Sequence, residues 1–394
     1  MKKFLLSFMF LAGILLLSAC VHRPFQCTDP FGCVMVGNKE SIKIGVLLTL
    51  SGPQSADGID ALHGVKLAMS DKGQVFGHPI ELVQQDDQCS QSSGQAGAQA
   101  LAANKQIVGV IGATCSISSQ AAAGILSDAG YVMISPSSTQ PSLTDPHAHP
   151  VGFLRTAYND GDQAAMAAKF AYSVLGIKSM VTVSDTSDAS KQLALATCQN
   201  FASLGGKCPL QVQLAPGQDA ASALQNIAAA QPGVVFLPDD PAVAAIIANG
   251  LAQTGVSNVT LIGPYNLMSK DFITKTQPNS SIMYFSGPAP ASDPQDFLQK
   301  YKNQFGENPI ASDHLQAYDA AALLFAAIER VAVPVSSMDN SIAIPRQALR
   351  TALYSLQNAN GLSGHLACKP TGDCAQTATV IYQFTDGSFK QIFP

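Results

Sequence analysis

Three hydroxyl side chains stand where an anion could be bound. Ser116 follows an apolar, strand-like segment and opens a helix expected over 118–128, while Ser137 and Thr139 follow a second apolar segment, 132–134, in a turn interrupted by proline. Hydroxyl groups and the free amides at the start of a helix both donate hydrogen bonds, so this pattern suits a carboxylate or another small anion. Ordinary helix caps use the same residue types, and that alternative stays open.

The usual signatures of catalysis are missing from the sequence. It has no Gly-x-Ser-x-Gly elbow, no glycine-rich phosphate loop ending in Lys-Ser/Thr and no His-Glu-x-x-His motif. His147 and His149 could supply two metal ligands, but their proline-flanked loop offers no obvious third. The pairs at 86–87 and 239–240, both Asp-Asp at strand ends, are more typical of turns and helix caps than of acid–base pairs. We therefore expect a protein that is not an enzyme and uses no metal or cofactor.

The first twenty residues have the pattern of an export signal. Lys2 and Lys3 form a positive start, and the apolar run 4–17 is too short to span a bilayer comfortably. The ending Leu-Ser-Ala-Cys resembles a bacterial lipobox, in which the cysteine is acylated and becomes the first mature residue. The sequence thus predicts a signal peptide over 1–19 and a lipid on Cys20. The alternative is an ordinary cleaved signal that ends in a cysteine by chance.

The cysteine count agrees with a lipidated, exported protein. The chain has nine cysteines, so an acylated Cys20 leaves eight, an even number suited to disulfides in an oxidising compartment. Residues 20–40 lack periodicity and are predicted to form a tether between the lipid and the folded domain. Short separations in sequence make three pairs candidates for disulfides, although many other pairings are possible: Cys27–Cys33, Cys198–Cys208 and Cys368–Cys374.

Length and composition limit the class of protein. Charged residues make up 12% of the 394 residues, about half the usual share, and the net charge is −5. An acidic chain without a basic block is a poor candidate for binding nucleic acid. The length suggests two domains, and the 47% hydrophobic content argues against disorder. No window after the leader reaches the roughly 18 apolar residues of a membrane span.

Short apolar segments alternate with helical patterns along the chain. Leu62, Val65 and Met69, for example, share one face of an expected helix. This alternation predicts an α/β fold with parallel sheets, in which ligands bind at the carboxyl ends of strands. We expect strands at 42–50, 80–85, 107–111, 132–134, 180–183, 210–214, 234–237, 259–262 and 282–285, and hairpin-like strands around 378–393. Further helices are expected at 93–104, 161–175, 189–203, 219–230, 241–254, 293–305, 313–330 and 346–357.

A series of motifs occurs in a fixed order along the chain. The chain reads IGVLLTLSGPQSADGIDALHGVKLAM and then GHPIELVQQDDQC, followed by VGVIGATCSISSQ (108–120) and YVMISPSSTQPSLT (131–144), and a later helix contains Ala317-Tyr318-Asp319-Ala320. In this order the motifs resemble the leucine/isoleucine/valine-binding family, which are type I periplasmic solute-binding proteins that feed ABC importers. The resemblance covers most of residues 42–394 and is weakest over 180–280.

The resemblance implies a fold and its division into domains. The family has two lobes, each a doubly wound parallel sheet, joined by three crossing strands, and the lobes close on a ligand in the cleft. By this resemblance lobe 1 is expected to comprise 41–156 and 287–376, and lobe 2 to comprise 157–286 and 377–394. The crossings are expected near 155–158, 284–288 and 376–380.

The resemblance also implies roles for particular residues. Residues matching Ser116, Ser137 (through its main chain) and Thr139 hold the ligand's α-carboxylate. The Cys89–Cys115 pair matches a bridged pair and would fix the loop that carries Ser116. Tyr265 stands where an acid usually meets the ligand's ammonium, so another acid would have to supply that charge. The candidates, which could equally be solvated loop acids, are Asp57, Asp188 and Asp239.

We therefore expect a lipid-anchored protein, exported to the periplasmic side of a membrane, that captures an amino-acid-like or other small carboxylate ligand for an ABC permease. The retained carboxylate loops favour this function. The alternative is an outer-membrane lipoprotein of the same fold that binds and activates a peptidoglycan synthase. Loss of the usual ammonium partner favours the alternative, and Val21 after Cys20 is compatible with outer-membrane sorting. An extracytoplasmic sensor is a third possibility.

Overall fold

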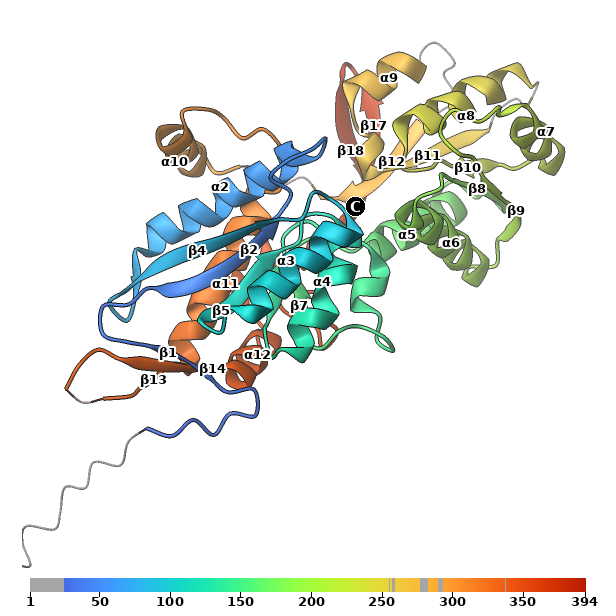
Figure 1. Ribbon diagram of the computed structural model, residues 1–394. Helices are drawn as coiled ribbons and strands as arrows, with labels where there is room; N and C mark the ends of the chain where they lie inside the picture. Colours follow the sequence, from blue (N-terminus) through green and yellow to red (C-terminus); the bar gives the residue numbers. More distant parts are fainter. Residues whose placement is uncertain (1–24, 255, 257–258, 277–282, 290–292, 337) are drawn as a thin grey trace, which may run out of the picture.

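Two β-sheets, each covered by helices on both faces, organise the chain in this computed structural model (Figure 1). The structure describes residues 25–254, 256, 259–276, 283–289, 293–336 and 338–394. The predicted signal peptide, Cys20 and Ile282 lie outside these residues. No helix within the described ranges is long and apolar enough to cross a membrane.

The first sheet forms the centre of lobe 1. Its strand β5 (Ile107–Gly112) is buried at every position, because helices cover both faces and the strand is apolar throughout. Neighbouring strands from β4 to β7 are parallel, and the short β3 pairs antiparallel at the edge. In order across the sheet, the strands are β3 (Gln74–Val75), β4 (His78–Asp86), β2 (Ile42–Leu48), β5, β6 (Met133–Ser135) and β7 (Phe153–Arg155).

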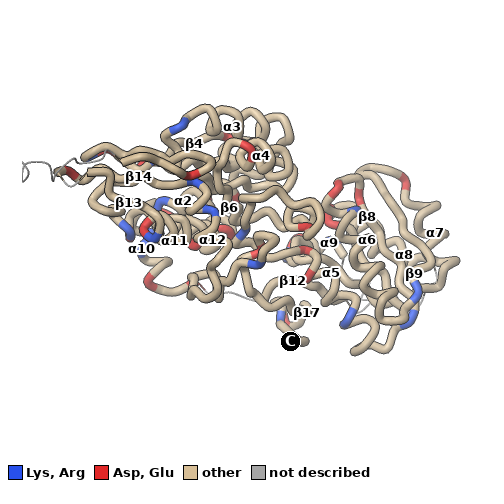
Figure 2. The backbone as a smooth tube through the Cα atoms, turned by 90° about the horizontal axis from the view of Figure 1, so that it is seen from below, with Lys and Arg blue, Asp and Glu red and all other residues tan. Residues whose placement is uncertain are grey.

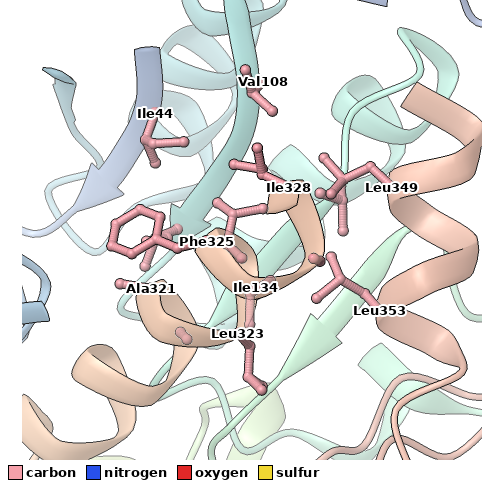
Figure 3. Packing of buried hydrophobic residues seen from close by; sticks show 14 of the residues in the cluster. Ile44, Val108, Ile134, Ala321, Leu323, Phe325, Ile328, Leu349 and Leu353 are labelled. Atoms are coloured by element: carbon pink, nitrogen blue, oxygen red, sulfur yellow. The ribbon is translucent and has the colours of Figure 1, made fainter. Parts of the chain in front are cut away.

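Different helices cover the two faces of this sheet. Helices α2 (Ser55–Lys72) and α11 (His314–Val331) pack on one face, where Phe325 and Ile328 of α11 contact the strands and α12 (Arg346–Tyr354) lies alongside (Figure 3). Helices α3 (Gln91–Ala103) and α4 (Ser116–Asp128) pack on the other face. The starts of α2 and α4 therefore approach the carboxyl ends of the strands from opposite faces.

The second sheet forms lobe 2. Strands β8 to β12 are parallel, except that β17 and β18 join the far edge antiparallel. The order is β18 (Ser388–Phe393), β17 (Thr379–Thr385), β12 (Met283–Pro288), β11 (Thr260–Pro264), β10 (Val234–Phe236), β8 (Ser179–Ser184) and β9 (Lys207–Gln213). One face carries α5 (Asp160–Lys169), its π-helical continuation (Phe170–Val174) and α6 (Asp188–Ser203), and the other carries α7 (Ala221–Ala230), α8 (Pro241–Gln253) and α9 (Lys270–Thr276).

The smaller elements belong mostly to lobe 1. The helix α10 (Gln295–Phe305) lies beside α2, and its Tyr301 is buried. Short strands and turns complete the fold: η1 (Pro141–Thr144), η3 (Tyr265–Leu267), β13 (Val333–Pro334), β15 (Ala359–Asn360) and β16 (His365–Leu366).

The predicted tether over 20–40 is wrong for its second half. Residues Cys33–Val36 form β1, which pairs antiparallel with β14 (Ile342–Pro345). Before it, the Asp29 carboxylate accepts hydrogen bonds from the first amides of α12, at 2.9 Å from Gln347 N and 3.1 Å from Ala348 N. A strand of four residues is too short to show a periodic pattern, so its burial against β14 could not be predicted from the sequence.

All four predicted disulfides are present. Three close short loops: Cys27–Cys33, Cys198–Cys208 and Cys368–Cys374. The fourth, Cys89–Cys115, joins the turn after β4 to the residue before α4. The pairing that the resemblance implied is thereby confirmed, and it ties the start of α4 to the neighbouring strand.

Candidate ligand-binding cleft

A cavity of about 1150 Å³ lies where loops from the two lobes meet. Six of the seven predicted ligand-binding residues line it: Asp57, Ser116, Ser137, Thr139, Asp188 and Tyr265. The seventh, Asp239, lies behind the wall, where its carbonyl oxygen accepts a hydrogen bond from Nδ2 of the lining residue Asn266 at 2.8 Å. The structure therefore brings together side chains that are more than 200 residues apart in the sequence.

The start of α4 faces the cavity without a side-chain cap. Its N-cap residue is Cys115, whose sulfur is in the disulfide, so no side chain bonds to the first amides. Among the described contacts, the amide groups of Ser116 and Ile117 have no acceptor. Unpaired amides at a helix start favour an anion. The Ser116 hydroxyl accepts a hydrogen bond from Gln140 N at 3.3 Å, which joins the helix start to the next loop.

The loop after β6 presents its main chain and one hydroxyl to the same cavity. Ser137 Oγ donates to the carbonyl of Thr114 at 2.9 Å, so its hydroxyl proton is already engaged, and its amide makes only a long bond of 3.4 Å to Ser135 Oγ. Thr139 Oγ1 lies 2.7 Å from Oδ2 of Asp160. Burial raises the pKa of Asp160, although its bond to Thr139 and the charge of Arg155 act in the opposite direction. The bond to Asp160 fixes the Thr139 side chain in the cavity wall.

Arg155 holds this loop in place, and its role was not predicted from the sequence. Its side chain is fully buried. Its guanidinium donates to Asp373 Oδ1 at 2.6 Å, to the carbonyls of Ser138 at 3.1 Å and Gln140 at 2.9 Å, and to Thr144 Oγ1 at 2.6 Å. A charged residue at the end of the apolar strand Phe153–Arg155 is the one signal in the sequence that pointed to it.

Gln140 adds a second feature that was not predicted. The residue lines the cavity yet is only 3% exposed, and its side-chain nitrogen has no hydrogen-bond partner among the described residues. A buried amide group without a partner costs free energy, so such a group in a cavity wall is suited to a ligand that completes the bond.

The opposite side of the cavity is acidic. Asp57 lies in the first turn of α2, and Asp313 lies immediately before α11. Neither carboxylate has a hydrogen-bond or salt-bridge partner within the described part of the chain. Behind them Asp60, which is fully buried, is hydrogen-bonded to His314 Nδ1 at 2.8 Å. Figure 2 shows several acidic positions at the junction of the two lobes.

Burial and mutual repulsion shift the pKa values of these acids. Burial raises the pKa of Asp57, and the nearby charge of Asp60 adds to the shift. Burial also raises the pKa of Asp313 to about 8, with further contributions from Asp57 and Asp60 and an opposing one from His314. On the lobe 2 side, burial and the charges of nearby acids raise the pKa of Asp239 to about 8. This part of the cleft thus favours neutral acids until a cation arrives.

The wall from lobe 2 contributes a tyrosine and an exposed acid. Tyr265, at the start of η3, meets Tyr158 edge to face with ring centroids 6.0 Å apart, and its amide donates to Gln163 Oε1 at 2.8 Å. Burial raises the pKa of Tyr265, so its hydroxyl stays protonated. Asp188 is exposed at the start of α6 and lies 3.3 Å from Lys191 Nζ.

Asp240, Asp87 and His149 have structural partners within the protein. Asp240 caps α8 by accepting from Ala242 N and Val243 N. Asp87 accepts from Thr49 Oγ1 at 2.5 Å and from Thr114 N at 3.0 Å, which fixes the turn after β4. His149 is hydrogen-bonded to the carbonyl of Asp145. No cluster of three or more potential ligands for a metal ion occurs among the residues that the structure describes.

Two α/β lobes with a ligand-sized cavity between them define a bilobed binding protein. The model of the family described as "Periplasmic binding protein" matches residues 41–388, and the chain belongs to this family. The family predicted from the sequence is therefore confirmed. The relatives and structural neighbours are binding proteins rather than enzymes.

Named relatives agree with this assignment. The Leu/Ile/Val-binding protein of Escherichia coli K12 is 32% identical over 187 residues, 47% of this chain and 48% of that protein. The match thus spans about half the length of the first curated relatives. The Leu/Ile/Val-binding protein BraC3 of Rhizobium johnstonii is 26% identical over 88% of this chain and 92% of its own. A leucine-binding protein of Thermotoga maritima is 25% identical, with a TM-score of 0.72 over 89% of this chain and 97% of its own.

Proposed function

We propose that this protein captures an amino-acid-like or other small carboxylate ligand in the cleft between its lobes and delivers it to an ABC importer. The observation that carries the proposal is the uncapped start of α4 beside Thr139 in the cavity wall. These groups match a carboxylate, because they line one cavity and the free amides of a helix start bind an anion without a basic side chain. The names of the relatives support an amino acid, since they are called Leu/Ile/Val-binding proteins.

The mechanism we propose is reversible closure of the lobes on the ligand. The lobes would be 41–156 with 287–376 and 157–286 with 377–394, and the connections after β7, after β12 and before β17 would act as hinges. No bond is made or broken in this cycle. Binding stabilises the closed arrangement only as far as the ligand contacts both lobes better when they are closed.

Calorimetry with amino acids and small carboxylates tests the function and the site together. The double variant Ser116→Ala/Thr139→Ala is expected to weaken binding by about 100-fold, because it removes two hydrogen bonds to a charged group. Ser203→Ala/Thr274→Ala is the matched control, since both hydroxyls are exposed and bond only to their own helices. Failure of every amino acid and carboxylate to bind would overturn the function, and unchanged binding by the cleft variant would overturn the site.

We further propose that the protein is exported and anchored by a lipid on Cys20. Labelling of the wild type, but not of Cys20→Ser, with a radioactive fatty acid is the expected result. Pull-down from detergent extracts then distinguishes an ABC permease from a peptidoglycan synthase as the partner. The names of the curated relatives refer to amino acids, which favours the permease.

A further inference from the structure

The carboxylate of Asp313 is free although the residue stands at the N-cap position of α11. An aspartate at this position usually accepts hydrogen bonds from the first amides of its helix. Here Asp60, from the neighbouring helix α2, does so instead: its Oδ2 lies 3.1 Å from Asp313 N and 3.0 Å from His314 N. Because Asp60 caps α11, the Asp313 side chain makes no capping bond and lines the cavity.

Asp57 is the second free carboxylate in this wall. It is held against the strand end by its neighbour Gly58, where a Cβ atom would lie only 1.9 Å from the carbonyl oxygen of Thr49. The close approach of helix and strand requires glycine at this position. The charge of Asp57 raises the pKa of Asp313, and both residues line the same cavity.

The charges that line the cavity do not balance. Four acids line it, Asp57, Asp188, Asp293 and Asp313, and no lysine or arginine is among its described lining residues. Asp188 has Lys191, and Asp293 lies 3.1 Å from Nε2 of His314. Asp57 and Asp313 form no ion pair with a described residue, although the charge of the lining residue His314 acts on Asp313. An amino acid with a neutral side chain brings one ammonium group and can pair with only one of these two carboxyl groups.

We propose that the cleft binds an α-amino acid whose side chain carries a second cationic group, and that Asp57 and Asp313 together neutralise the two cations. This inference rests on the proposed function and names its ligand class, the dibasic amino acids. Leu/Ile/Val-binding relatives are named for ligands with neutral side chains, so the proposed specificity differs from theirs.

The layout of the cavity suits such a ligand. Donors for the α-carboxylate come from the start of α4 and the loop after β6, and the unpartnered nitrogen of Gln140 lies in the same wall. The acids come from α2 and the approach to α11, which cover the opposite face of the sheet. A ligand that is anionic at one end and cationic elsewhere matches this separation, and the cavity of about 1150 Å³ leaves room for a long side chain.

The release of a proton from Asp313 on ligand binding gives a second, independent test of the inference. The groups that face Asp313 are Asp57, Asp60, His314 and the hydroxyls of Tyr158 and Tyr265. Because its pKa is raised to about 8, Asp313 holds a proton at pH 7 in the empty cleft. A cation beside it lowers that pKa, so the proton leaves on binding. Calorimetry in two buffers of different ionisation enthalpy measures the release.

The decisive experiment compares ligands that differ in charge but little in shape. We expect L-lysine to bind at least ~10-fold more tightly than L-norleucine, and L-arginine to bind more tightly than L-citrulline by a similar factor. Either Asp57→Asn or Asp313→Asn leaves one carboxylate in this wall. One carboxylate is enough for the single ammonium group of norleucine but not for the two of lysine. The preference for lysine over norleucine should therefore fall to about 3-fold or less. Asp271→Asn is the matched control, because this exposed acid pairs with Lys275 away from the cavity.

The outcomes separate the inference from the proposed function. Tighter binding of norleucine or leucine than of lysine would overturn the dibasic specificity and leave solute binding intact. Failure of every amino acid and carboxylate to bind would overturn both. An unchanged lysine preference in both variants would overturn the roles of Asp57 and Asp313. Thermal unfolding of each variant shows whether it is folded, and either variant alone is sufficient for the test.

Discussion

The two sides of the cleft differ in which of their polar groups have partners within the protein. On the side of α4, contacts within the protein hold the wall in place: Arg155 binds the loop carbonyls, and Cys89–Cys115 ties down the helix start. The groups left without a partner among the described residues are donors, namely the first amides of α4 and Nε2 of Gln140. On the side of α2 and α11, Asp57 and Asp313 have no partner among the described residues. In the function we propose, the first side holds the group that all the ligands share, a carboxylate. The second side carries acids that the proposed ligand would pair with, so we propose that it sets the selectivity.

Replacing Arg155 should have the largest effect on stability, because its hydrogen bonds hold the loop after β6 in place. In Arg155→Met the Asp373 carboxylate and two loop carbonyls lose their partner, and we expect a loss of about 3–5 kcal/mol in the free energy of unfolding. Urea denaturation measures it. Arg330→Met is the control, since this exposed arginine makes only a 3.4 Å contact with Ser355 Oγ. A loss below about 1 kcal/mol would show that the loop is held by other contacts.

Opening the Cys89–Cys115 disulfide tests whether this bridge supports ligand affinity as well as stability. Cys89→Ser/Cys115→Ser releases a bridge across 26 positions and should cost about 3 kcal/mol, with about tenfold weaker ligand binding because the start of α4 is no longer fixed. The control Cys198→Ser/Cys208→Ser opens a bridge of separation 10 in lobe 2, far from the lining residues. This control variant should lose stability but keep the ligand affinity of the wild type. Equal losses of affinity in the two variants would contradict the bracing role.

On the acidic side, substitution should stabilise the empty protein. The raised pKa of Asp313 means that the folded state keeps a proton which the unfolded chain releases above about pH 4, so the wild type loses stability as the pH rises from about 4 to about 8. Asp313→Asn removes this cost. It should be about 1–2 kcal/mol more stable than the wild type at pH 8 and equal to it at pH 4, by chemical denaturation. A variant that is less stable at pH 8 would show that the carboxylate has a structural partner.

The exposed acid should matter least. Asp188 lines the cavity mouth but is solvated and lies near Lys191, so Asp188→Asn should change stability by less than about 0.5 kcal/mol and ligand affinity by less than about twofold. Calorimetry beside the wild type checks both. A larger loss of affinity would show that the charge which sets the selectivity lies in lobe 2 rather than in lobe 1.

The side of α4 could be predicted from the sequence because its signals are local. Ser116 and Thr139 each follow a strand within a few residues, and the resemblance to a known family supplied the pairing of Cys89 with Cys115. The α/β order was likewise visible as alternating apolar segments. Asp57 was identified as a candidate through the same resemblance, which left the ligand's ammonium without its usual acidic partner.

The decisive partners of the remaining residues are distant in sequence. An aspartate before a helix predicts a cap, and Asp313 is free only because Asp60, 253 positions away, caps the helix instead. Arg155 depends on Asp373, 218 positions away. The strand β1 depends on β14, about 300 residues later. In each case the tertiary contact decides the role, and the local residue type alone predicts a different one.

With the lipid that we propose on Cys20, the pairing of β1 with β14 would also limit the distance between the protein and the membrane. Asp29 is bound to α12, and it follows Cys20 by nine positions in the sequence. Fully extended, that length spans about 30 Å. A lipid on Cys20 would therefore keep lobe 1 within one domain diameter of the bilayer and leave lobe 2 as the part that swings. The protein would search for its importer by diffusing in two dimensions, at a nearly constant height above the membrane.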